Sequence, residues 1–157
     1  MKQLYFAIIY LCFSLSWAQL QPIDFNQRIQ ESNVVVEGVV LEQNPFWNSK
    51  KTKIYTVNRI QVYKIFKGSK SLTSIDICTS GGTIGFEKHE VNPSLKLEAG
   101  DTGLFILKPS QTSLEGKNNA ALFRPFGSKM GFVKYDLTKG TAKGPFESFN
   151  NIDKSLY

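Results

Sequence analysis

The 157-residue chain has the composition of one folded domain. Its hydrophobic fraction of 41% and charged fraction of 20% exclude a disordered chain and an integral membrane protein. The net charge of +6 comes mainly from scattered lysines, which indicate a solvated face. Weak attraction to an anionic glycan, lipid or nucleic acid is the alternative.

The first 18 residues have the pattern of a secretory signal peptide. A single charge at Lys2 precedes an apolar run, and the small residues Ser16 and Ala18 predict cleavage after Ala18. The run is shorter than the roughly 20 residues that a membrane span needs, which disfavours the alternative of a membrane anchor. We therefore expect a secreted, periplasmic or cell-surface protein, with no transmembrane segment after signal removal. Cys78 remains as its one cysteine, so an internal disulfide is excluded.

A short helix is expected directly after the leader. Asp24 is suited to cap its first turn, and Phe25 and Ile29 share one face at i, i+4. We expect this helix to plug one end of the barrel that the following strands form.

Residues 33–68 predict two long antiparallel strands. The first is rich in valine, with Gly38 at a point where a barrel strand bends. A polar break around Pro45 and Trp47 separates it from the second strand. There the apolar alternation changes phase at Asn58-Arg59, which predicts a β-bulge or a strand that passes from one side of the barrel to the other.

The rest of the chain predicts further short strands that close the barrel. Ser80-Gly81-Gly82 predicts a tight turn, and glycine-rich residues near the end predict a loosely held tail. The expected strands cover residues 72–79, 83–91 and 102–107, followed by a polar loop at 110–119 and a last hairpin of 120–126 with 130–137. The predicted fold is all-β, a small barrel spanning residues 19–145 with a tail at 146–157.

The order of these features resembles a known family. The motifs that carry the resemblance are Val34 to Val40, an aromatic residue near Trp47, Ile54 to Val57, Val62 to Gly68, Gly81-Gly82, and Gly100-Asp101 leading into Gly103 to Leu107. Their order is similar to that of secreted bacterial domains. Those domains are related to the OB-like N-terminal barrel of tissue inhibitors of metalloproteinases and to netrin modules. The resemblance implies the barrel alone. The animal inhibitors chelate zinc through an N-terminal cysteine, and a mature chain starting at Gln19 has none there.

Three groups of residues could carry a catalytic, metal or phosphate site, but each is better explained by a structural role. Cys78 with His89 is the one nucleophile and base pair, without a local signature around either residue. Glu87, His89 and Glu90 mix imidazole and carboxylate on one strand, but one histidine among exposed acids favours a solvated face. Residues 81–85 lack the lysine and the helix of a phosphate loop, which favours turn geometry. We expect no catalytic residues, no metal and no cofactor.

A binding face is the strongest functional prediction. Phe46, Trp47 and Tyr55 lie at or near the loop 43–53, and long loops at a barrel rim commonly carry recognition. We expect an exported, non-enzymatic module that binds an envelope protein or polysaccharide, and no nucleic acid because of the signal peptide. The alternatives are an envelope hydrolase or protease-inhibitor-like protein, and the front module of a longer secreted protein.

Overall fold

The computed structural model describes residues 21–110 and 122–152. The predicted signal peptide with its cleavage site after Ala18 lies outside the described residues, as do most of the predicted polar loop and residues 153–157 of the predicted tail.

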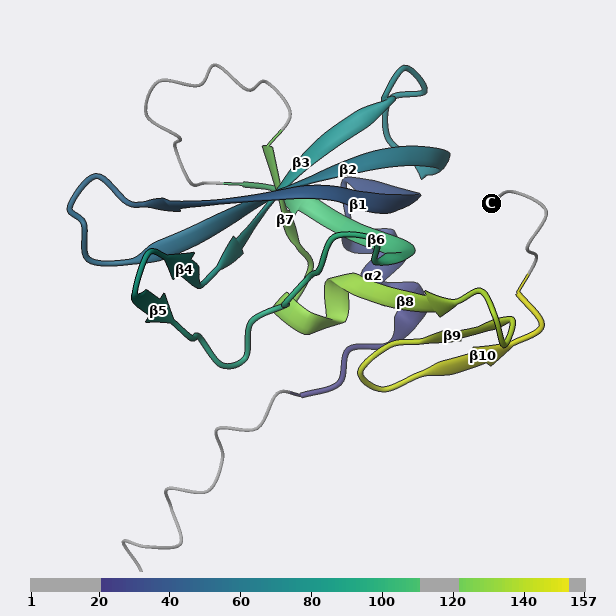
Figure 1. Ribbon diagram of the computed structural model, residues 1–157. Coiled ribbons are helices and arrows are strands. Elements are labelled where there is room, and N and C mark those ends of the chain that lie inside the picture. Colours follow the sequence, from purple (N-terminus) through teal and green to yellow (C-terminus); the bar gives the residue numbers. More distant parts are fainter. Residues whose placement is uncertain (1–20, 111–121, 153–157) are drawn as a thin grey trace, which may run out of the picture.

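The chain forms a closed barrel of five strands, in the spatial order β1-β2-β3-β7-β6, with β6 returning to β1 (Figure 1). All neighbours are antiparallel except β3 and β7. The predicted all-β small barrel with a short N-terminal helix is confirmed, and it is compatible with an OB-like barrel. The elements of the barrel are α2 (Phe25–Glu31), β1 (Val34–Trp47), β2 (Ile54–Lys67), β3 (Ser74–Ser80), β6 (Thr102–Pro109) and β7 (Leu122–Pro125).

Two further parts are attached to this barrel. One is a separate hairpin of β4 (Gly82–Ile84) and β5 (Glu87–His89). The other continues the sheet from β6 through β8 (Phe132–Asp136), β9 (Thr141–Lys143) and β10 (Ser148–Asn150), after the 3-10 turn η1 (Ser128–Gly131). Figure 1 shows the β1–β2 hairpin projecting beyond the barrel, with β4 and β5 beneath it. We call this end of the barrel the rim.

The barrel interior is one apolar cluster to which every barrel strand contributes. Each fully buried aliphatic side chain of this kind stabilises the fold by about 1.5–3 kcal/mol. Its buried members are Val34, Val36, Val40, Ile60, Ile75, Ile77, Leu95, Leu97, Phe105, Leu107 and Phe132.

The barrel closes where two glycines face each other. Gly38 of β1 pairs with Gly103 of β6 and, on its other side, with Val62 of β2. A Cβ atom on Gly38 would lie 2.2 Å from the carbonyl oxygen of Gln61. The register of β1 with β2 shifts between Glu37 and Gly38, at the position where the sequence predicts a bend.

The predicted phase change at Asn58-Arg59 is wrong, because β2 pairs with β3 without interruption from Tyr55 to Gln61 and its even positions from 54 to 60 are buried. A bulge of the β1–β2 ladder does lie opposite this point, where Leu41 of β1 stands between the pairs Val40–Ile60 and Glu42–Arg59. Two further register shifts leave Tyr63 and Phe66 of β2 without a direct partner in this ladder. The hydrophobic alternation misleads here because two inward positions carry polar side chains.

The predicted break at Pro45 is also wrong, since β1 runs on through Trp47. β1 pairs with β6 only as far as Val39, so Pro45 lies in a stretch whose second edge is unpaired, where a proline is tolerated. The loop is therefore confined to residues 48–53. The Asn48 side chain stabilises it by accepting hydrogen bonds from the backbone N–H groups of Thr52 (2.8 Å) and Lys53 (3.0 Å).

Two other expected strand arrangements differ. The single strand predicted at 83–91 is the β4–β5 hairpin, folded at Gly85-Phe86 with Gly85 at φ +59°. The last predicted hairpin does not form, because β7 and β8 each pair with β6 rather than with each other. The β6 edge is long enough to accept both strands one after the other.

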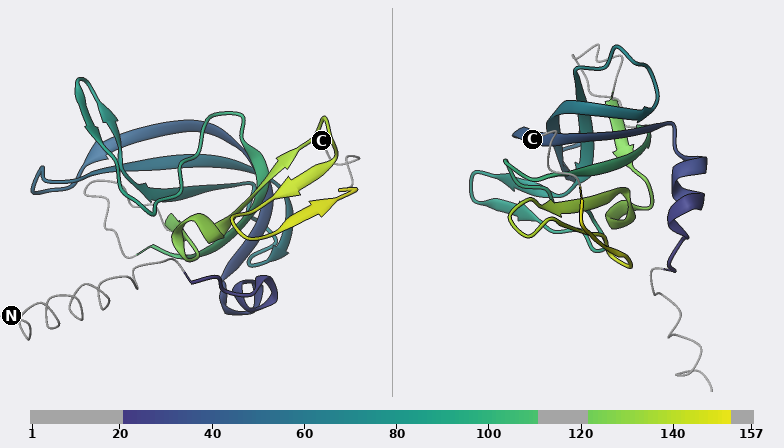
Figure 2. Two further views of the ribbon diagram at one scale, coloured as in Figure 1. Left: turned by 90° about the horizontal axis from the view of Figure 1, so that it is seen from below. Right: turned by 90° about the vertical axis from the view of Figure 1, so that its right-hand side faces the viewer.

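The helix α2 has the predicted cap, since the Asp24 carboxylate accepts from the N–H groups of Asn26 and Gln27. It does not plug an end of the barrel. Phe25 and Ile29 pack with Val35 and Ile106. The sequence neighbours of these two strand residues point into the barrel interior, so Val35 and Ile106 themselves point outward. The helix therefore covers the outer wall of the barrel (Figure 2).

A buried ion pair joins α2 to the last hairpin. The side chain of Arg28 is 1% exposed, and its Nη2 lies 2.7 Å from Oε2 of Glu147. Its Nη1 donates to the carbonyl of Met130 at 2.6 Å. The predicted boundary at residue 145 thus falls inside the β9–β10 hairpin, and residues 146–150 are held by strand pairing and by Glu147.

We expect Gly38→Ala to lower the free energy of unfolding by about 1–3 kcal/mol, because the new methyl group overlaps the Gln61 carbonyl. Ser74→Ala, at an exposed strand position, is the control and should stay within about 0.5 kcal/mol. Urea denaturation of both variants measures the difference. Equal stabilities would contradict a steric requirement at the closure.

We expect Glu147→Ala to destabilise the protein by about 3–5 kcal/mol, because it leaves the Arg28 charge buried without a counter-ion. Glu42→Ala removes an ion pair to Arg59 in which both side chains are about half exposed, and it should cost less than about 1 kcal/mol. Chemical denaturation compares the two. Similar losses would show that burial does not set the strength of the Arg28 pair.

Candidate binding site at the barrel rim

The rim brings together one aromatic and one imidazole ring from distant parts of the sequence. The rings of Trp47 in β1 and His89 in β5 meet edge to face, with centroids 5.1 Å apart and planes at 89°. Nδ1 of His89 accepts a hydrogen bond from the backbone N–H of Ile54 at 3.2 Å. His89 therefore ties the β4–β5 hairpin to the start of β2.

The structure divides the predicted face of Phe46, Trp47 and Tyr55. Phe46 and Tyr55 lie directly opposite each other on β1 and β2, with ring centroids 5.9 Å apart. Successive residues of a strand point to opposite faces, so Trp47 projects away from this pair and toward His89. All three side chains are half-buried, but they do not share one surface.

A cavity of about 290 Å³ lies beside His89. We call it the rim cavity. Polar side chains from β1, β2, β3 and the β4–β5 hairpin line it, together with apolar groups such as Leu95 and Leu97. The polar side chains include Gln43, Thr56, Thr79, Ser80, Lys88 and His89.

Behind this wall a buried asparagine organises the polar side chains. Asn58 is fully buried, and its Nδ2 donates to the Ile77 carbonyl and to Oγ1 of Thr79, both at 3.1 Å. Its Oδ1 accepts from Nε2 of Gln43 at 2.8 Å, and the same Gln43 nitrogen donates to the Leu97 carbonyl at 2.6 Å. A buried polar group costs free energy unless it is hydrogen-bonded, and the side-chain amides of Asn58 and Gln43 both are. The cavity wall is consequently fixed in position.

The glycine pair at the cavity edge supports the structural interpretation of residues 81–85. Gly81 has φ +97°, a conformation that favours glycine, and its N–H donates to the Ile54 carbonyl at 2.9 Å. A Cβ atom on Gly82 would lie 2.5 Å from Oγ1 of Thr56. The N–H of Gly81 is thus engaged within the fold. Positive φ at Gly81 and the close approach at Gly82 account for both glycines, although the turn itself lies at Gly85-Phe86 and not at the predicted Ser80-Gly81-Gly82.

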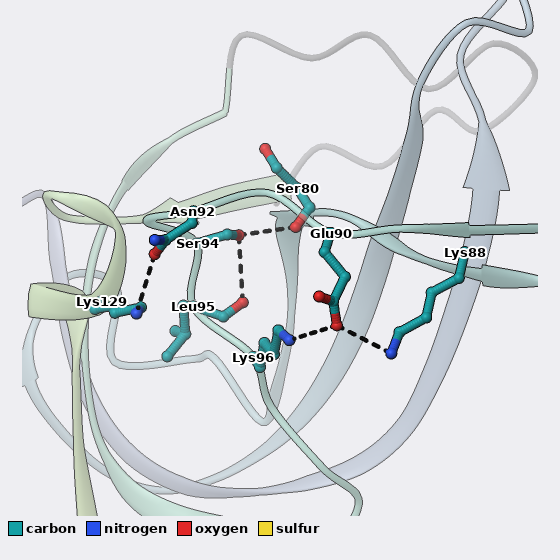
Figure 3. A network of polar contacts seen from close by, with 8 residues as sticks. All are labelled: Ser80, Lys88, Glu90, Asn92, Ser94, Leu95, Lys96 and Lys129. Carbon is teal, nitrogen blue, oxygen red and sulfur yellow. Dashed lines mark hydrogen bonds and ion pairs between the residues drawn. The ribbon is translucent and has the colours of Figure 1, made fainter.

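Glu90 forms a charged bridge at the mouth of the rim cavity. Its carboxylate lies 2.9 Å from Nζ of Lys88 and 3.0 Å from Nζ of Lys96, and Figure 3 shows it between the two lysines. Nearby, Oγ of Ser94 donates to the Ser80 carbonyl at 2.8 Å. The hydrogen bonds from Lys88 and then Lys96 lower the pKa of Glu90 from its ordinary value near 4.5 to about 2.

The structure does not bring Cys78 and His89 together as a reactive pair. Thr79 lines the rim cavity with His89, and Cys78, its neighbour on β3, points to the other face and is buried. Glu87, His89 and Glu90 do not converge on a metal either. Within residues 21–110 and 122–152, no group of three or more His, Cys, Asp or Glu side chains is arranged to hold one.

The sequence interpretation missed the polar wall. The apolar alternation of Tyr55 and Val57 predicts a change of phase farther along this strand, whereas Thr56 and Asn58 themselves are buried. Their spacing of two residues on one strand, with Thr79 on the next, is the pattern that marks a polar inner surface.

A comparison with protein-family models and a search of curated proteins find no match to this chain. In the described part of the chain, no helix has the length and apolar character needed to cross a membrane.

The lowered pKa of Glu90 predicts a titration that is shifted to acid pH. The ion pairs with Lys88 and Lys96 should be fully present above about pH 4.5, the ordinary value, and be lost only as the pH falls through about 2. We expect the carboxyl resonance of Glu90 in an NMR titration to have its midpoint near 2. In the Lys88→Gln, Lys96→Gln variant, the midpoint should return toward the ordinary value. An unchanged midpoint would show that the two lysines do not cause the shift.

Proposed function

We propose that the protein is an exported, non-enzymatic β-barrel module that binds a polysaccharide or an envelope protein at the cell envelope or outside the cell. The contact of Trp47 with His89, beside the rim cavity, carries this proposal. It combines a large half-buried aromatic side chain with a polar hollow, the usual elements of a small-ligand or interface hot spot.

The proposed function assumes that the barrel is OB-like, of the kind found in metalloproteinase inhibitors and netrin modules. Two observations support it: the strand order β1-β2-β3-β7-β6 with closure onto β1, and the parallel pairing of β3 with β7. OB-like barrels bind oligosaccharides and oligonucleotides on the face of strands 2 and 3 and on adjoining loops. The rim cavity uses β2 and β3 residues, which fits this mode.

Polysaccharide is the favoured partner class because of the side chains that surround the cavity. Ser80 offers a hydroxyl group and Gln43 its amide oxygen to sugar hydroxyls, and Trp47 offers an aromatic surface at His89, beside the cavity. Their positions are set by strand pairing and by the Asn58 hydrogen bonds, so little ordering is needed on binding.

The test compares two neighbouring aromatic residues on opposite faces of β1. Mature chain starting at Gln19 is immobilised beside its Trp47→Ala and Phe46→Ala variants, and each is exposed to a polysaccharide panel and an envelope extract. We expect the parent and Phe46→Ala to retain a polysaccharide, and Trp47→Ala to bind it at least about tenfold more weakly.

Circular dichroism and thermal unfolding of all three proteins control for folding. Equal retention by the folded Trp47→Ala variant would overturn the assignment of the face. Failure of the parent to retain any polysaccharide, with an envelope protein captured instead, would assign the module to protein binding.

A further inference from the structure

A second cavity, of about 600 Å³, lies on the far side of the segment that carries Glu90. It extends from residues 90–96 to the η1 turn and to the loop between β9 and β10. Its volume falls in the range typical of small-ligand sites. Apolar atoms are supplied by Val91, Leu95, Phe132 and Pro145, and charged groups by Glu90, Lys96, Lys129 and Lys143. We call it the lysine cavity.

The charges around the lysine cavity do not balance. Three lysines face one glutamate, a net lining charge of +2. In the rim cavity Lys88 and Lys96 are offset by Glu90 and Glu98. The two cavities share the wall that contains Glu90 and Lys96, so the positive excess belongs to the side of Lys129 and Lys143.

These two lysines have no carboxylate partner among the described residues. Lys96 is engaged by Glu90, but Nζ of Lys129 meets only Oδ1 of Asn92, at a long 3.4 Å (Figure 3). Lys143 forms no ion pair with any residue in the described ranges. Two ammonium groups are thus available to a ligand, each with free hydrogen-bond donors.

We propose that the lysine cavity binds an acidic oligosaccharide, one that carries carboxylate or sulfate groups. Ammonium groups at the edge supply charge-assisted hydrogen bonds to the anion. The apolar lining, made of the buried Phe132 and Leu95 and the exposed Val91 and Pro145, suits the C–H faces of sugar rings. This inference rests on the proposed function, because it names the kind of polysaccharide and gives it a second site.

The experiment measures affinity for three matched trisaccharides by isothermal titration calorimetry with the mature chain. They are trigalacturonate, a sulfated galactose trisaccharide and neutral galactotriose, with inorganic sulfate as a fourth probe. We expect one or both acidic sugars to bind, with an affinity that falls as salt is raised, and the neutral sugar to bind at least about tenfold more weakly.

Variants locate the site. Lys129→Gln with Lys143→Gln should weaken the acidic sugar about tenfold or more, because it removes both unpaired ammonium groups. Lys50→Gln with Lys70→Gln makes the same charge change at exposed lysines away from the cavity, and should leave the affinity within twofold. Trp47→Ala is measured beside them to distinguish a sugar site at the rim from one in the lysine cavity.

Three results would overturn the proposal: no binding of either acidic sugar, equal loss in the two double-lysine variants, or inorganic sulfate binding as tightly as the sugars. Loss of trisaccharide binding in Trp47→Ala with retention in Lys129→Gln, Lys143→Gln would move the sugar site to the rim. The proposed function and this inference therefore fail by different outcomes.

Discussion

The close pairing of β1 with both β2 and β6 is the constraint on which the rest of the structure depends. At Gly38 the backbones of β1 and β2 approach so closely that a Cβ atom does not fit. Gly103, the partner of Gly38 on β6, is equally confined, because its Cβ atom would lie 2.2 Å from the Val133 carbonyl. Two facing glycines let three strands curve tightly enough to close a small barrel around an interior filled by side chains.

The same closure determines where the rim begins. β1 leaves β6 after Val39 and continues with β2 alone. The register shift at Leu41 reverses the two faces of the strand, so that odd-numbered residues beyond it lie on the side that even-numbered residues occupy before it. Gln43 consequently faces the polar cavity and Trp47 faces His89. A single extra residue in β1 thus converts an apolar inner strand into part of the wall of the rim cavity.

The sequence predicts the parts of this fold that depend on local chemistry. Asp24 caps a helix through its own carboxylate, and Gly81 adopts a positive φ between β3 and β4. The position of the register shifts was not predictable from alternation, because Asn58 points into the protein only by virtue of partners on β1 and β3. The contact of Trp47 with His89 and the gathering of Lys96, Lys129 and Lys143 depend on tertiary folding, which no local pattern encodes.

The ion pair between Arg28 and Glu147 has a mechanical consequence. It joins the first helix to the last hairpin, and the contact of Phe25 with Phe149, with ring centroids 5.4 Å apart, lies beside it. A force that pulls the two ends apart acts on these two contacts before it acts on the β1–β6 ladder. The barrel and its rim are therefore shielded from a force that pulls the two ends apart until this ion pair opens.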